Sequence, residues 1–200
     1  MFIQVITANV TDPEGLLRQR DRWESEIRPG AVGVLGSTGG ITSDGRFVIM
    51  ARFASEADAR RNSERAEQGQ WWAETEKMLR DVEFKDSVEV KTPSGGGTDD
   101  AGFVQVMRGH VKDADRLAAM EATMAENEPA MRKYRPDVLG QVIAMHADGT
   151  YTNAVYFSSE AEARAGETSP PPPEIQAAFA DMEAAVTVDE YLDLTEPWLR

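Results

Sequence analysis

The polar residues that can carry out chemistry are few, and two of them stand at matching positions of similar segments. Asn9 and His110 lie 101 residues apart, near the ends of FIQVITANV and FVQVMRGHV. Histidine titrates near neutral pH, so His110 is a candidate general base. Asn9, Arg108 and Arg52 can donate hydrogen bonds to an oxyanion. These four residues form the predicted catalytic set, although a histidine at the end of a strand is also commonly a surface or structural residue.

Aromatic residues make up most of the second candidate group. Trp71 and Trp72 are adjacent on a predicted helix, where neighbouring side chains point about 100° apart. At most one of them can therefore face the core squarely, and the second is a candidate to line a pocket; the alternative for both is core packing or a domain contact. Tyr151, Tyr156 and His146 complete the predicted ligand-binding set. His146 stands beside a predicted turn, and in the absence of a ligand role we expect it to be solvated.

Metal and cofactor motifs are missing from the sequence. The chain has no cysteine, and its two histidines have no carboxylate at metal-ligand spacing. GSTGG at 36–40 is glycine-rich, but it lies inside a predicted strand and opens no helix, which favours a β-bulge over a phosphate-binding loop. We expect no metal and no cofactor.

The net charge of −14 disfavours binding to nucleic acid and to anionic membranes. The apolar runs are much shorter than the ~20 residues that cross a bilayer, and MFIQVITANV lacks the basic start of a signal peptide. We expect a cytoplasmic protein whose partner is a small molecule.

These candidates are distributed over an internal duplication. RFASEADAR at 52–60 returns as YFSSEAEAR at 156–164, which is 104 residues later. Further matches are Phe2 with Phe103, Gln4 with Gln105, Leu16 with Leu117, Gly36 with Gly140, Met78 with Met182, and Pro93 with Pro197. We predict two repeats, 1–92 and 103–200, joined by a linker of glycine, serine and aspartate at 93–102.

Each repeat has the same order of elements. An apolar strand precedes a helix with an N-terminal aspartate, a hairpin turns at Asp-Gly, a serine begins the next helix, and a final strand follows. The order β-α-β-β-α-β predicts an α+β ferredoxin-like repeat, a four-stranded sheet with helices on one face. The bare faces are expected to pack sheet to sheet as an intramolecular pseudo-dimeric α+β barrel. We expect a monomer with an internal pseudo-dimer; a further homo-oligomer stays open.

The order of these motifs resembles the antibiotic biosynthesis monooxygenase-like group of the dimeric α+β barrel superfamily. The likeness is carried by TDPEG at 11–15, FASEADAR, FSSEAEAR and QWW at 70–72, and it covers nearly the whole chain as two consecutive domains. The resemblance implies a small-molecule pocket between sheet and helices. It also implies activities that include cofactor-free oxygenation of polyketide quinols, haem degradation and non-catalytic roles.

The haem-degrading branch of that group uses an asparagine on the first strand, with a tryptophan and a histidine on the second helix. Asn9, Trp71 and Trp72 are present, but 73–80 contains no histidine, so we do not expect haem. The predicted function is binding of a small apolar or aromatic molecule in a barrel cavity. The predicted reaction is cofactor-independent monooxygenation of a quinol or polyketide-type substrate with His110 as base. The alternative is a non-catalytic duplicated scaffold that binds a metabolite or a partner.

Overall fold

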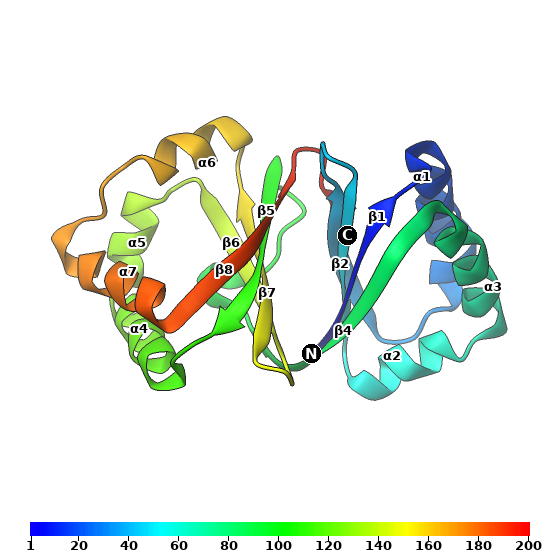
Figure 1. Ribbon diagram of the computed structural model, residues 1–200, viewed down its shortest axis with the longest axis horizontal. Coiled ribbons are helices and arrows are strands. Elements are labelled where there is room, and N and C mark those ends of the chain that lie inside the picture. Colours follow the sequence, from blue (N-terminus) through cyan, green and yellow to red (C-terminus); the bar gives the residue numbers. More distant parts are fainter. The chain divides into compact units, whose positions relative to one another are not determined.

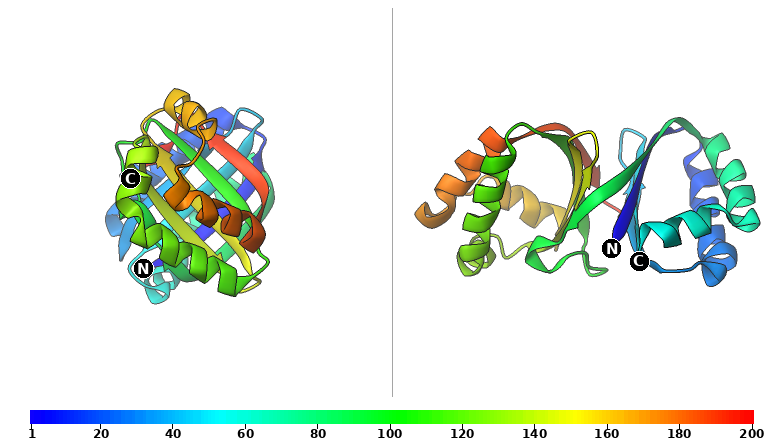
Figure 2. Two further views of the ribbon diagram at one scale, coloured as in Figure 1. Left: turned by 90° about the vertical axis from the view of Figure 1, so that its left-hand side faces the viewer. Right: turned by 90° about the horizontal axis from the view of Figure 1, so that it is seen from below.

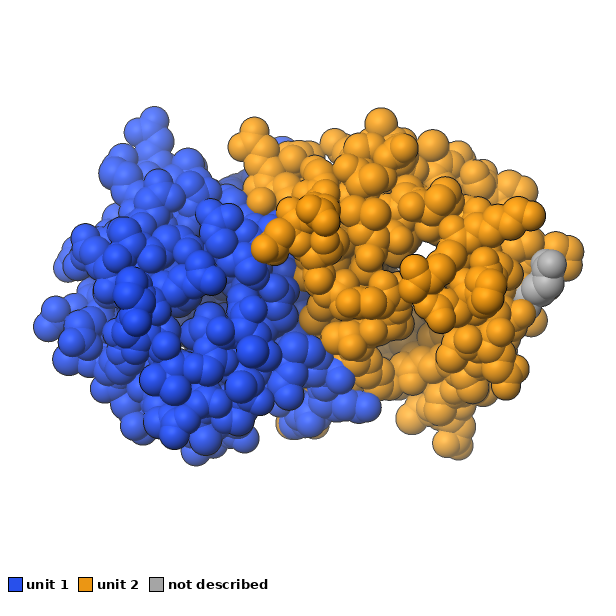
Figure 3. Space-filling view, turned by 180° about the vertical axis from the view of Figure 1, so that it is seen from behind, with its two compact units in different colours: residues 1–90, 198–200 blue, residues 91–197 orange. Residues whose placement is uncertain are grey.

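The computed structural model of the protein describes residues 1–173 and 175–200. It has two compact units, shown in two colours in Figure 3. Unit 1 consists of Met1–Val90 together with Trp198–Arg200, and unit 2 consists of Lys91–Pro197. The last three residues of the chain thus belong to unit 1, although unit 2 precedes them in the sequence.

Unit 1 contains a five-stranded antiparallel sheet. Its strands are β1 (Phe2–Val10), β2 (Val34–Ile41), β3 (Arg46–Phe53), β4 (Leu79–Lys91) and the two-residue β9 (Trp198–Leu199). The order across the sheet is β4-β1-β3-β2-β9. The register of β2 on β3 shifts between Val34 and Gly36, which confirms the predicted bulge in the glycine-rich segment.

The helices of unit 1 cover one face of its sheet (Figures 1 and 2). They are α1 (Pro13–Arg22), the π-helical turn η1 (Trp23–Ile27), the 3₁₀ turn η2 (Arg28–Gly30), α2 (Glu56–Ser63), α3 (Ala66–Thr75) and the 3₁₀ turn η3 (Glu76–Met78). The predicted N-caps are present: Asp12 accepts a hydrogen bond from the Gly15 N–H at 2.8 Å, and Ser55 accepts one from the Asp58 N–H at 3.1 Å.

In each repeat the second predicted helix is divided into two helices. In unit 1 the helical run stops at Ser63 and resumes at Ala66, because Arg65 takes an extended conformation. The Arg65 side chain donates a hydrogen bond to the Ile27 carbonyl at 3.1 Å, which fixes the break to the segment after α1. The break gives α3 an axis of its own, independent of α2.

Unit 2 repeats the plan. Its strands are β5 (Phe103–Val111), β6 (Val138–His146), β7 (Thr150–Phe157) and β8 (Val186–Leu194), in the antiparallel order β8-β5-β7-β6. Its helices are the 3₁₀ turn η4 (Pro93–Gly95), α4 (Ala114–Glu126), α5 (Glu128–Tyr134), α6 (Glu160–Glu167) and α7 (Pro173–Ala185). Both units therefore have the predicted β-α-β-β-α-β order, and the α+β ferredoxin-like class is confirmed.

The two faces of the unit 1 sheet are both apolar. Ile6 and Ala8 of β1 pack with α1, while Ile3 and Val5 point to the face opposite the helices. Ile3 and Val5 are nonetheless only 0% and 2% exposed. The sheet-to-sheet packing of the two repeats stays a prediction. Within the part of the chain that the structure describes, no helix is long and apolar enough to cross a membrane.

Candidate functional site

A cavity of about 150 Å³ lies in unit 1 between the helix-facing side of its sheet and the helices α1, α2 and α3 with the turn η1. Its aromatic lining consists of Trp23, Phe47, Phe53, Trp71, Trp72 and Trp198. These include all four tryptophans of the chain. Aromatic side chains concentrated around one cavity are typical of small-molecule sites.

Trp71 and Trp72, which both belong to the predicted ligand-binding set, both line the cavity. The Trp71 indole N–H donates to the Gln19 carbonyl of α1 at 2.8 Å, which holds α3 against α1. Trp72 packs edge-on against Phe84 of β4, with ring centres 5.2 Å apart. Each indole is thus fixed by a contact outside the cavity and presents its remaining surface to it.

Trp23 lines the cavity but does not belong to the predicted ligand-binding set. It begins the π-helical turn η1, which inserts an extra residue per turn and brings both Trp23 and Glu24 into the lining. Its indole N–H donates to the Gln68 side chain of α3 at 3.1 Å. π-Helical turns occur frequently at functional sites. The available sequence signal was the apolar spacing of the helix, which does not distinguish a π turn from an α turn.

The polar groups of the lining mostly have partners within unit 1. The Asn62 amide donates to the Val32 carbonyl at 2.6 Å and accepts from the Val32 N–H at 3.0 Å. The Gln4 amide donates to Asp86 at 3.1 Å, and the Thr75 hydroxyl donates to the Trp71 carbonyl at 2.9 Å. With these groups and the two indole N–H donors engaged, the cavity presents mainly carbon to an occupant.

Charged side chains gather at one end of the cavity. Glu24 lies 2.8 Å from the Arg28 guanidinium and 3.5 Å from the Arg200 guanidinium. Arg20 pairs with Asp21 at 2.7 Å. Glu24 is the carboxylate of the lining, so a proton acceptor for a bound acid is available at this end.

The corresponding positions of unit 2 are built differently. At the repeat offsets Trp23, Trp71, Trp72 and Trp198 are matched by Met124, Ile175, Gln176 and Ser94. Tyr151 stands where unit 1 has Phe47, and its hydroxyl donates to the Thr187 carbonyl at 3.0 Å. Burial raises the pKa of Tyr151 to about 12. The side chains of Asn153 and Gln141 bond each other at 3.0 Å. Unit 2 therefore has no counterparts of the four tryptophans, and it has hydrogen-bonded polar side chains, Tyr151, Gln141 and Asn153, where unit 1 has Phe47, Ser37 and Ile49.

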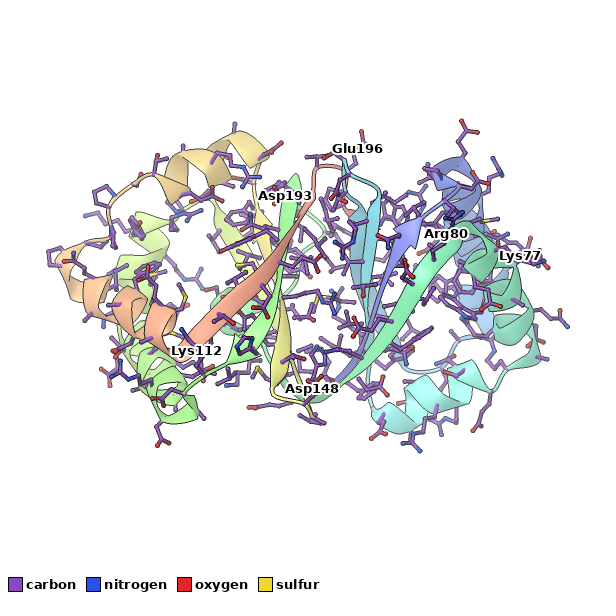
Figure 4. All side chains as sticks on the ribbon, viewed as in Figure 1. Lys77, Arg80, Lys112, Asp148, Asp193 and Glu196 are labelled. Atoms are coloured by element: carbon purple, nitrogen blue, oxygen red, sulfur yellow. The ribbon has the colours of Figure 1, made fainter. Side chains whose placement is uncertain are left out.

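One polar pair is retained in both units. Gln105 donates to Asp193 at 3.0 Å, as Gln4 does to Asp86 in unit 1. Asp193 is labelled on β8 in Figure 4. Arg164 also bonds Asp193 and stacks over the Phe103 ring at 5.2 Å from its centre. The duplication is thus visible in side-chain contacts as well as in element order.

The structure places His110 away from the cavity lining. His110 is on β5 of unit 2 and its side chain is 50% exposed. Its Nδ1 lies 3.1 Å from Asp189 and 2.9 Å from the Thr187 hydroxyl. The hydrogen bond from His110, followed by that from Thr187, lowers the pKa of Asp189. His110 has a carboxylate partner that its sequence neighbours did not reveal.

The other predicted catalytic residues also lie outside the lining. Asn9 donates to Asp81 at 2.9 Å, and Arg108 donates to Glu190 at 3.2 Å. Arg52 donates to the Thr38 hydroxyl at 2.7 Å from the face of the sheet opposite the helices. The catalytic roles of these residues and of His110 stay predictions, and the structure does not group them with Trp71 and Trp72.

His146 and Tyr156 are buried in unit 2. His146 is 6% exposed, with Nε2 3.0 Å from the Thr152 hydroxyl, so the expectation of a solvated histidine is wrong. The reason is that β6 continues through His146 and its side chain joins a buried polar pair on the sheet. Tyr156 is 1% exposed. Their ligand-binding roles, like that of Tyr151, stay predictions.

Metal-ligating side chains do not cluster in residues 1–173 and 175–200: no three or more histidine, aspartate or glutamate side chains are arranged to hold an ion.

No family model and no curated protein matches the chain. Several solved structures do match the chain. A putative monooxygenase from Lactobacillus acidophilus NCFM is 11% identical with a TM-score of 0.70, over 96% of this chain and 90% of that chain. A putative monooxygenase from Fusobacterium nucleatum is 8% identical with a TM-score of 0.71, over the same shares of both chains. An anthrone oxidase-like protein is 10% identical with a TM-score of 0.63, over 99% of this chain and 88% of that chain. At these identities the likeness shows the fold alone. It confirms, at the level of the fold and over both repeats, the resemblance predicted from the order of the motifs.

Proposed function

We propose that unit 1 binds a small, flat, apolar aromatic molecule in its cavity. The observation that carries this proposal is the gathering of all four tryptophans around one cavity, with the indole N–H groups of Trp23 and Trp71 bonded inside the protein. Such walls offer ring faces and edges for stacking, and they leave few polar groups that a hydrophilic molecule could satisfy.

The volume of the cavity limits the size of the occupant. An apolar cavity of about 150 Å³ accommodates a molecule of roughly the size of benzene. A phenol or quinol with one ring therefore fits the cavity in its present form. A polyketide-type molecule with several fused rings requires the walls to move.

Cavity filling tests the binding proposal. Ala51 of β3 lines the cavity, and Ala51→Leu adds three carbon atoms to its floor. Ala57 is exposed on α2, so Ala57→Leu adds the same volume outside and serves as the matched control. Para-cresol at ten times its Kd should stabilise the wild type and the control by about 1.4 kcal/mol, which corresponds to a rise in Tm of about 3–5 °C. The proposal requires Ala51→Leu to lose this rise; an equal rise in both variants would exclude the cavity as the binding site.

We further propose that the bound molecule is a quinol that is oxygenated by O2 without a cofactor. A hydroquinone and O2 give a hydroxyquinone and water: one ring C–H becomes C–OH, the two original hydroxyls become carbonyls, and the second oxygen atom leaves as water. The substrate supplies all four electrons. The support is the fold shared with structures named as putative monooxygenases and as anthrone oxidase-like.

Removing the proton from the quinol is the activating step, and two residues compete for this role. Glu24 lines the cavity, whereas His110 is the base predicted from the sequence. Oxygen uptake with hydroquinone should be measured for wild type, Glu24→Gln and His110→Ala. Loss of oxygen uptake in Glu24→Gln alone would identify Glu24 as the base. Loss of oxygen uptake in His110→Ala alone would identify His110 as the base. Wild-type uptake no faster than the uncatalysed reaction would favour the alternative function, a scaffold that binds a metabolite without chemistry.

A further inference from the structure

Trp198 and Arg200, near the end of the chain, line the cavity of unit 1. Trp198 and Leu199 form β9, which pairs with the free edge of β2 by placing Leu199 opposite Thr38 and Trp198 opposite Gly39. Two more hydrogen bonds extend the pairing, from the Ser37 N–H to the Arg200 carbonyl at 2.9 Å and from the Arg200 N–H to the Ser37 carbonyl at 3.1 Å. The last residues of repeat 2 are thereby built into unit 1.

Trp198 points to the helix side of the sheet. Its ring centre lies 6.0 Å from that of Phe47, and the Arg20 guanidinium lies 5.1 Å from the Trp198 ring centre on α1's side. Both neighbours also line the cavity. Trp198 therefore spans the space between sheet and helix at one end of the cavity. Leu199, the next residue, points to the opposite face of the sheet.

Close backbone approach fixes β9 in place. A Cβ atom on Gly36 would lie 2.0 Å from the Arg200 carbonyl oxygen, and Gly36 has a φ of +143°. The same carbonyl oxygen accepts a hydrogen bond from the Arg52 guanidinium at 2.8 Å. The Arg200 guanidinium lies 3.5 Å from Glu24. Glycine at position 36 is required because no other residue leaves room for the strand.

A similarly close backbone approach recurs in unit 2 without the aromatic side chain, although the approaching segment there follows the 3₁₀ turn η4 and is not a strand. A Cβ atom on Gly140 would lie 1.8 Å from the Gly96 carbonyl oxygen, and Gly140 and Gly96 correspond to Gly36 and Arg200 at the repeat offset of 104. The position that matches Trp198 is Ser94. The close approach thus forms without a large residue at this position, so the backbone arrangement alone does not account for Trp198.

We propose that Trp198 is a specificity-determining residue that closes one end of the ligand site and limits the bound molecule to about one aromatic ring. This inference rests on the proposed binding function of the cavity. The ligand class that follows is a neutral monocyclic phenol or quinol. Removal of the Trp198 side chain opens the end of the cavity toward Arg20 and lengthens the space available for fused rings.

The test compares two neutral probes that differ in length, para-cresol with one ring and anthracenemethanol with three fused rings. Affinities are measured by isothermal titration calorimetry, because changes at Trp198 alter the intrinsic fluorescence. Wild type should bind para-cresol at least about ten-fold more tightly than anthracenemethanol. In Trp198→Ala that ratio should fall by about ten-fold or more. Leu199→Ala truncates the same strand on its other face and should keep the wild-type ratio.

Trp198→Leu and Trp198→Phe keep the test decisive if Trp198→Ala does not fold, and each should give an intermediate ratio. Wild type that binds para-cresol together with an unchanged ratio in folded Trp198 variants would overturn this inference and leave the binding proposal standing. An equal change in Leu199→Ala would also overturn it, because loosening of β9 would then explain the effect. Failure of wild type to bind either probe would overturn both proposals together.

Discussion

The carbonyl oxygen of Arg200 lies only 2.0 Å from the position that a Cβ atom on Gly36 would occupy. This contact joins the last residue of the chain to the bulge of β2 and holds Trp198 against the cavity. The shape of the cavity depends on this contact, because β9 forms the end wall of the cavity.

Gly36→Ala should therefore weaken both the fold and the site. We expect a loss of about 2 kcal/mol or more in the free energy of unfolding, because the new methyl group must displace β9 and the positive φ adds strain. Urea denaturation measures the loss. Gly45→Ala is the matched control: its φ is +83°, and nothing lies within 4 Å of the added Cβ. It should cost only about 1 kcal/mol. Equal losses in the two variants would mean that β9 does not press on Gly36.

Gly69→Ala should act in the opposite direction. Gly69 is inside α3, has helical backbone angles, and has nothing within 4 Å of an added Cβ. Replacement by alanine should raise the free energy of unfolding by about 0.5–1 kcal/mol. Because the new methyl group lies outside the cavity lining, the Kd for para-cresol should not change. A weaker affinity would show that the cavity needs a flexible α3.

Tyr151 makes stability depend on pH in the alkaline range. Its pKa is raised to about 12 in the folded protein, against an unfolded value of about 10. The folded state therefore holds this proton more tightly, so the stabilisation is complete below pH 10 and is lost as pH rises through 12. The difference amounts to about 2–3 kcal/mol. Tyr151→Phe should flatten the dependence of unfolding free energy on pH between 10 and 12, as followed by urea denaturation. A slope identical to that of wild type would contradict the raised pKa.

His110→Ala should leave ligand binding in the cavity unchanged. His110 is half-exposed on β5 and contacts Asp189 and Thr187, and it does not belong to the cavity lining. The Kd for para-cresol, measured by calorimetry, should stay within about two-fold of wild type, since substitutions of exposed residues outside a binding site have small effects. Asp189→Asn, which keeps the side-chain shape, is the control for the loss of this pair. A large loss of affinity in His110→Ala would place His110 in the binding site.

The duplication, the order of the elements and the helix caps could be predicted because they depend on local spacing. Asp44-Gly45 predicts a tight turn, and Gly45 adopts a φ of +83°. The face of each strand that meets the helices could not be predicted. Ile3 and Val5 are apolar, as Ile6 and Ala8 are, and they are at least as buried, so β1 has no polar face from which to identify the sides of the sheet.

The candidate site was predicted only in part, for a related reason. Trp71 and Trp72 can be recognised in the sequence as neighbouring aromatic residues on a predicted helix. Trp198 cannot be recognised in this way, because it reaches unit 1 from the end of repeat 2, and periodicity reports only local partners. The available signal was the repeat itself: Pro93 matches Pro197, but Ser94 does not match Trp198. A large residue gained in one copy at a position that is small in the other indicates a role beyond the shared fold.

Ligand binding, as proposed, depends on the apolar, ligand-sized cavity that unit 1 encloses between β3 and α3. Xenon occupies apolar cavities of this size independently of any particular substrate. A crystal structure determined under xenon pressure is the most direct test, and we expect a xenon atom among Trp71, Phe47 and Trp198 in wild type and none there in Ala51→Leu. A wild-type structure with these side chains collapsed onto one another and no xenon between them would contradict the account.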